Sequence, residues 1–359
     1  MPLPQLAAAL ATALAAALPA PVLAHVKWFS RFSFADPPLA LRAVLTPTFF
    51  ALLALSMAAM VALTLLDRRL APVRRYQQVN DWLEARSGNA LTIMRVGIGA
   101  SLLLSWQADA LLAPELRAAD APWIGWAQFV CAFLLLFDAT VPAAGALLMA
   151  LFGAGVVRVG AFHMLDYVMF LGAGYYLLVS RAKTPAVRGT GLPALYLGVG
   201  FSLCWVALEK LVYPQWGLYL LQQNPQLALG FDGRFFLTAA AFVEFSLGYL
   251  LIINLLQRPL ALAITLVFFT TTLVFGKLEV IGHTPIHAAL VVFLLEGPGR
   301  VYQPPIAFHR RLGLRTAFAA VNFAVLLAAL LLPYLAGARR AHDARVPGAG
   351  ARAAAAAHA

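Results

Sequence analysis

The stretch that decides the fold is LTIMRVGIGASLLLSW, residues 91–106. It begins an apolar run over residues 91–112, which is long enough as a helix to cross the roughly 30 Å hydrocarbon core of a bilayer. Similar runs recur along almost the whole chain. Of its 359 residues, 62% are hydrophobic and only 11% are charged, far from the usual composition of soluble domains. The sequence therefore predicts an all-α, polytopic membrane helical bundle.

The apolar runs predict about ten membrane spans, connected by short loops. They cover residues 44–66, 91–112, 124–141, 143–162, 164–180, 192–211, 235–256, 259–278, 284–297 and 314–336. Arginines gather in the loop 67–90 and after the fifth and ninth spans, which places these loops in the cytoplasm. Successive loops should alternate between the two sides of the membrane, with arginines in the cytoplasmic loops (the positive-inside rule). Three arginines after residue 336 conflict with this rule. Either the last span is oriented against the rule, or the count within 124–180 is wrong by one.

The net charge of +11 follows these loops, so it predicts contact with membrane lipid and no nucleic-acid partner. Residues 1–24 resemble a cleavable signal peptide, with cleavage after Ala24. The predicted location is the inner membrane of a bacterium, with the mature N-terminus in the periplasm. Residues 25–43 form a periplasmic aromatic and basic segment, and the low-complexity tail 337–359 is predicted to be disordered.

An internal repeat is visible in the matching stretches GIGASL, residues 97–102, and GVGFSL, residues 198–203. It predicts two tandem four-helix units, residues 91–180 and 191–297, flanked by one span on each side. With the stretch LGVGFSLCWVALEKLVYP, residues 198–214, this pattern resembles the DoxX-like membrane proteins. The resemblance implies a small module linked to respiratory or redox physiology, with a redox partner subunit and quinone as possible associates.

The predicted metal site is a copper site formed by His25, His283 and His287. Cleavage after Ala24 gives His25 a free amine beside its ring, and these two nitrogens chelate one ion. An N-terminal histidine that chelates in this way resembles the histidine brace of copper monooxygenases. Nitrogen ligands in a planar arrangement suit Cu(II). The residues predicted as further ligands, or as groups that orient the ligands, are Glu279, His163 and Asp166.

The stretch GKLEVIGHTPIH, residues 276–287, carries two of these histidines. Thr284 and Pro285 predict a helix start, with Thr284 as N-cap and Pro285 at the first helical position. His283 and His287 then converge on one side. The alternative is structural, with His283 closing a turn and His287 bonded to a neighbouring helix.

The segment HVKWFSRFSF, residues 25–34, also has a simpler interpretation. Its aromatic residues fit the headgroup region of the membrane, while Lys27 and Arg31 contact anionic lipid. For Lys210, at the outer end of a predicted span, the corresponding interpretation is a lysine that extends to the membrane surface.

Two carboxylates define an alternative function, although no catalytic residue is assigned. Glu244 lies within a predicted span, where an ionised carboxylate needs a partner or a polar cavity, and Glu209 lies at the end of another. They are candidates for a metal-free, quinone-linked or proton-handling oxidoreductase subunit. A membrane transporter is the third possibility, because repeated bundles with ionisable residues also suit transport.

Overall fold

The computed structural model describes residues 25–299 and 305–346. The predicted signal peptide and most of the predicted tail therefore lie outside the described residues. Within them the structure is helical, with one isolated bridge between Ala110 and Arg117 and no strand. The long helices are α3 (Pro47–Leu70), α5 (Ala90–Gln107), α6 (Pro122–Leu134), α7 (Val141–Val159), α9 (Met169–Val179), α11 (Gly191–Val212), α13 (Gly233–Ile253), α14 (Gln257–Phe275), α15 (Lys277–Glu296) and α16 (Leu312–Asp343). Shorter ones include η1 (Val26–Trp28), α2 (Leu41–Val44), α4 (Arg74–Glu84), α8 (Ala161–Met164), η4 (Leu165–Tyr167), α10 (Pro185–Gly189) and α12 (Pro214–Gln223).

Seven helices in the described part of the chain are long and apolar enough to cross a membrane. The number rises to eight if Ala161–Tyr167 and Met169–Val179, which meet at a bend of 62°, form one broken span. Two further apolar stretches, Pro122–Leu134 and Gln257–Thr270, are shorter. These helices support a multi-pass membrane protein, but the predicted count of about ten spans is not confirmed.

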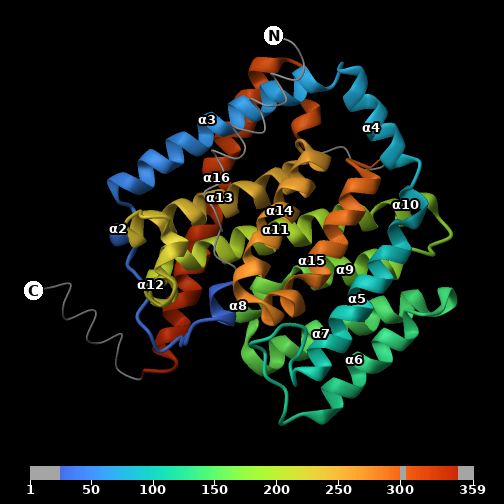
Figure 1. Cartoon of the computed structure of the whole chain (residues 1–359), viewed down its shortest axis with the longest axis horizontal. Helices are drawn as coiled ribbons and strands as arrows, with labels where there is room; N and C mark the ends of the chain where they lie inside the picture. The colour runs from blue at the N-terminus through green and yellow to red at the C-terminus, as the bar shows by residue number, and fades with distance from the viewer. Residues whose placement is uncertain (1–24, 300–304, 347–359) are drawn as a thin grey trace, which may run out of the picture.

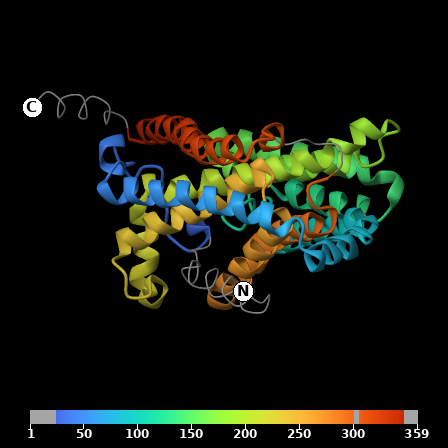
Figure 2. The same ribbon diagram turned by 90° about the horizontal axis from the view of Figure 1, so that it is seen from above.

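Eight of the described helices form a closed ring of helix contacts. Each of α5, α6, α7, α9, α11, α13, α14 and α15 contacts the next one, and α15 contacts α5. Figure 1 shows α11 and α13 running together through the middle of this arrangement. Helices α3 and α16 pack on each other and on α13, and α16 lies along one edge of the molecule in Figure 2. The ring brings α9 next to α11 and α5 next to α15.

Glycines permit both of these close helix contacts. A Cβ added at Gly97 on α5 would lie 2.1 Å from the Cβ of Ala288 on α15. A Cβ added at Gly198 on α11 would lie 3.1 Å from the Cα of Gly172 on α9. Gly97 and Gly198 begin the two matching sequence stretches. The first glycine of each stretch thus allows a close approach between its helix and a neighbouring one, as small residues do in membrane bundles.

The structure corrects the predicted helix start at Thr284. Helix α15 runs without interruption from Lys277 to Glu296 and contains Pro285 in its interior. It is separated from α14 by Gly276 alone, whose φ of 66° lies in the region that favours glycine. The hydroxyl of Thr284 donates to the carbonyl of Val280 inside the helix. Proline is tolerated in such helices because neighbouring groups and local adjustments satisfy the freed carbonyl.

The last helix also extends beyond its prediction. Helix α16 continues to Asp343, whereas the predicted span ended at residue 336 and the predicted tail began at residue 337. The apolar pattern stops near Arg339 and Arg340, but the helix does not, because arginine is a good helix former. Residues 347–359 of the tail lie outside the described part.

Part of the N-terminal segment, residues 25–36, is buried in the bundle, whereas Arg31 is exposed. The interpretation that places this segment at the lipid surface is therefore wrong for Lys27, Trp28 and Phe34. Lys27 is only 3% exposed and Phe34 only 4% exposed. The indole Nε1 of Trp216 donates to Asp36 Oδ2 at 2.7 Å. The backbone nitrogen of Leu39 donates to the carbonyl of Val212 at 2.9 Å. The aromatic residues of this segment therefore contact protein, and its lysine needs partners inside the protein.

Gly282 on α15 provides the space for Trp28. A Cβ at Gly282 would lie 1.9 Å from the indole Cη2, so Gly282→Ala is expected to displace Trp28 and to lower the free energy of unfolding by about 1–3 kcal/mol. Because alanine has a higher helix propensity than glycine, a loss of stability in Gly282→Ala would come from the contact of the added Cβ with Trp28. Thermal unfolding in detergent micelles measures it. Gly153→Ala, at a position with nothing within 4 Å, is the control and is expected not to destabilise; equal stability of both variants would contradict the prediction.

Candidate metal centre

A break in the helical chain places two of the predicted site residues. Helix α7 ends at Val159 and is followed by Gly160, whose φ of 89° lies in the region that favours glycine. The short α8 and η4 follow and carry His163 and Asp166. The chain then bends by 62° into α9. Both side chains are buried, and they lie at the end of the bundle where the N-terminal segment enters.

Glu115 reaches the same region from the loop between α5 and α6. The Gln128 side chain on α6 fixes this loop, because it accepts from the nitrogen of Leu112 at 3.0 Å and donates to the carbonyl of Ala110 at 2.9 Å. The hydroxyl of Tyr167 donates to Glu115. Burial raises the pKa of Glu115 to about 8, so in the metal-free protein this carboxyl group is largely protonated at neutral pH.

Lys27 joins two carboxylates from different parts of the bundle. Its Nζ lies 2.6 Å from Asp166 Oδ2 and 2.8 Å from Glu209 Oε2 near the end of α11. All three side chains are 1% exposed. Burial alone would lower the pKa of Lys27, but the Asp166 and Glu209 charges outweigh it and hold the pKa well above its usual value. The ammonium group therefore remains charged and ties the N-terminal segment to α11 and η4.

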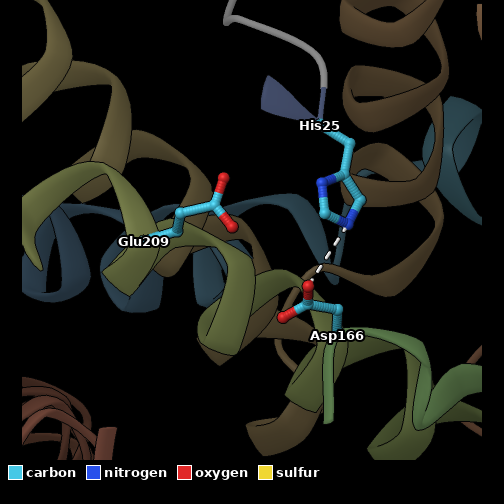
Figure 3. Close-up of side chains that lie close together, drawn as sticks. All are labelled: His25, Asp166 and Glu209. Atoms are coloured by element: carbon cyan, nitrogen blue, oxygen red, sulfur yellow. Dashed lines mark ion pairs between the residues drawn. The ribbon is translucent and has the colours of Figure 1, made fainter. Parts of the chain in front are cut away.

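His25 lies close to both carboxylates, with its ring directed at Asp166 and with Glu209 to one side of the ring (Figure 3). Its Nε2 is 3.7 Å from Asp166 Oδ2. The ring stacks on Trp28 and Tyr167, at centroid distances of 5.0 and 5.4 Å. Burial and then the charge of Lys27 lower the pKa of His25 well below its usual value, so the imidazole is neutral. Neither ring nitrogen has a hydrogen-bond partner among the described groups.

Two groups of three side chains in the described chain have the composition of a metal site. One is His25, Asp166 and Glu209; the other is Glu115, His163 and Asp166. Within each group, one potential ligand atom per residue lies within 4.8 Å of the others. Neutral imidazole and carboxylate are the ligands that divalent transition metals prefer.

His283 and His287, the other two predicted first ligands, belong to neither group. His283 pairs with Glu279 one turn earlier on α15 and stacks on Phe268 at 4.2 Å. The Trp28 ring contacts both His25 and His283, with centroids 4.9 Å apart in the second case. His287 is half-buried against Phe269. The structure thus brings His25 together with Asp166, while His283 lies on the other side of Trp28 and His287 lies against Phe269.

A small cavity of about 40 Å³ connects these regions. It is mostly apolar and is lined by, among others, His25, Trp28, Asp166, Glu244 and His283. A cavity of this volume has room for at least one water molecule. His25 and Glu244 therefore line the same cavity, although they lie more than two hundred residues apart in the sequence.

Glu244 is not alone within its span. Its Oε2 lies 2.6 Å from Nζ of Lys210, and both side chains are buried, at 6% and 0% exposure. The interpretation of Lys210 as a lysine that extends to the membrane surface is therefore wrong. Its side chain instead points into the bundle, from α11 toward α13, because an ionised carboxylate in a membrane span needs a partner.

Sequence reasoning missed Lys27, Glu115 and Tyr167 as members of the cluster. Lys27 fitted a lipid-facing segment equally well, and only its burial reveals its role. Glu115 lies at the same end of the bundle as the predicted ligands His25 and His163. This shared location was the signal by which the sequence could have identified it. Tyr167 follows Asp166 directly, and its partner comes from a loop about fifty residues earlier, a contact that no local pattern contains.

No family model matches the chain, and neither a curated protein nor a solved structure matches it at a significant level.

Proposed function

We propose that this protein binds copper at a buried membrane-protein site formed by His25, Asp166 and Glu209, and uses it for copper handling or redox chemistry at the membrane surface. The observation that carries the proposal is the convergence of three buried side chains, from the residue before η1, from η4 and from α11, with ligand atoms within 4.8 Å of one another.

The donor atoms fit this metal. A neutral imidazole and two carboxylates give one nitrogen and two oxygens, and cleavage after Ala24 would add the amine of His25. Mixed nitrogen and oxygen ligands in a tetragonal arrangement suit Cu(II). Oε2 of Glu209 pairs with Lys27, whereas Oε1 is buried without a hydrogen-bond partner in the described chain, and a buried oxygen of this kind gains from coordination. His283 and His287 lie outside this first set of ligands.

The proposal includes a topology. The protein would lie in a bacterial inner membrane with about ten spans, two tandem DoxX-like four-helix units and a periplasmic mature N-terminus. The packing of Gly97 and Gly198 at two corresponding helix contacts supports the tandem units. The location of His25, Glu115, Asp166 and Glu209 at one end of the bundle supports a single metal-binding face.

Glu209→Gln is expected to weaken Cu(II) binding at least about tenfold, since even groups behind the ligands contribute 10- to 100-fold. The protein is purified without chelators, its N-terminus is sequenced, and Cu(II) is titrated with metal analysis and electron paramagnetic resonance. Glu84→Gln on α4 is the matched control and retains wild-type affinity. Equal affinity of Glu209→Gln and Glu84→Gln, with both variants folded, would refute the site.

A second candidate function is proton handling by a quinone-linked membrane subunit without metal. The Lys210–Glu244 pair inside the bundle favours it, because Glu244 also lines the cavity that His25 and Asp166 share. Buried ionisable pairs of this kind mark proton paths in membrane proteins. The two functions differ in their dependence on Glu244, which lies in neither group of potential metal ligands.

A further inference from the structure

We infer that the site is a dinuclear metal centre, in which Asp166 bridges a first ion held by His25 and Glu209 and a second divalent transition-metal ion held by Glu115 and His163. This inference rests on the proposed function for its first ion. Its own basis is the second group of potential ligands, whose atoms also lie within 4.8 Å of one another. Asp166 is the member that both groups share.

The two oxygens of Asp166 have different surroundings. Oδ2 lies 3.7 Å from His25 Nε2 and 2.6 Å from Lys27 Nζ. Oδ1 is buried and has no hydrogen-bond partner among the described groups. A buried carboxylate oxygen without a partner is costly in a protein. A bridging carboxylate would use both oxygens, one for each ion.

The second group is also short of hydrogen bonds. His163 Nε2 lies 3.6 Å from Glu115 Oε1, with side-chain exposures of only 8% and 5%. His163 Nε2 and Glu115 Oε2 are both buried without a hydrogen-bond partner in the described chain. Three side chains from three elements, the loop before α6, α8 and η4, thus lie close together, and each has a buried polar atom without a hydrogen-bond partner in the described chain. A cation among them would provide the missing interaction.

Neighbouring side chains hold these potential ligands in place. Tyr167 donates to Glu115 and accepts from the indole Nε1 of Trp28 at 3.1 Å. The Phe32 and Phe34 rings contact the His163 ring edge to face, at centroid distances of 5.6 and 5.4 Å. Hydrogen bonds to ligating carboxylates and a dry surrounding shell are typical of built metal sites. One imidazole and two carboxylates suit Zn(II) or Cu(II).

Metal stoichiometry tests the inference on the full chain, with Cu(II) as the probe. Wild type is expected to bind two ions per chain. His163→Gln should keep the first ion and lose the second, Glu209→Gln should lose the first, and Asp166→Asn should lose both. His287→Gln, outside both groups, is the control and keeps two ions. Retention of one ion by His163→Gln also shows that this variant is folded.

Electron paramagnetic resonance provides an independent readout. Two Cu(II) ions joined by one carboxylate couple magnetically, so the integrated signal of wild type should fall below its total copper as the second equivalent binds. His163→Gln should give a signal equal to its copper content. A single ion that Glu209→Gln removes and His163→Gln retains would overturn the dinuclear centre and leave the proposed function intact. Two ions retained by His163→Gln would also overturn it, and no bound copper in wild type would refute both.

Discussion

Lys27→Met is expected to lower the free energy of unfolding of the metal-free protein by about 3–5 kcal/mol, because removal of one partner leaves buried charges without compensation. The Lys27 ammonium is the cation within 3 Å of both Asp166 and Glu209 in the described structure. Methionine retains much of the side-chain volume and none of the charge. The two carboxylates, from η4 and α11, would then repel each other inside the protein.

Thermal unfolding in detergent micelles measures this effect, with Lys277→Met as the matched control. Lys277 is exposed at the start of α15, so its loss should change stability by less than about 0.5 kcal/mol. Cu(II) should restore much of the stability of Lys27→Met, since a metal ion would compensate the same carboxylates. A Lys27→Met protein as stable as Lys277→Met would show that the carboxylates are neutral or otherwise paired.

The helical membrane bundle could be predicted from sequence because apolar runs must be helical in a bilayer, whatever they pack against. Gly97 and Gly198 both lie within helices, as the apolar residues around them in the sequence indicated. Helix limits were less predictable. Proline is common at the first position of a helix, but Pro285 lies inside α15. The arginines near residue 340 end the apolar pattern of the sequence, but α16 continues beyond them.

The candidate site could be predicted only in part. Asp166, Glu209 and His25 were identifiable because ionisable groups near membrane spans need partners. Their grouping was not, since it depends on the bend between η4 and α9 and on where the N-terminal segment enters. The same lysine chemistry suits a lipid surface and a buried ion pair. The sequence around Lys27 and Lys210 therefore favoured the surface, and tertiary packing placed both side chains inside.

Lys210→Met is likewise expected to lower the free energy of unfolding by about 3–5 kcal/mol, whereas Lys210→Met combined with Glu244→Met should be close to wild type. Removing one partner leaves Glu244 charged or forces it to take up a proton, while replacing both partners with apolar side chains of similar size is often neutral or stabilising. The pair lies 2.6 Å apart and is buried between α11 and α13. A double-mutant cycle, measured by thermal unfolding, gives the coupling energy directly.

The double variant also separates the two candidate functions, because its stability removes unfolding as an explanation for lost activity. If Glu244 handles protons, the stable double variant should lose proton-coupled activity in proteoliposomes. Its Cu(II) binding should stay unchanged, since neither residue belongs to a group of potential metal ligands. Loss of copper binding in a folded double variant would instead join the pair to the metal site through the cavity that Glu244 and His25 line. A double variant as unstable as Lys210→Met would contradict the prediction that its stability is close to that of wild type. The loss of stability would then come from the shape of the replaced side chains and not from their charge.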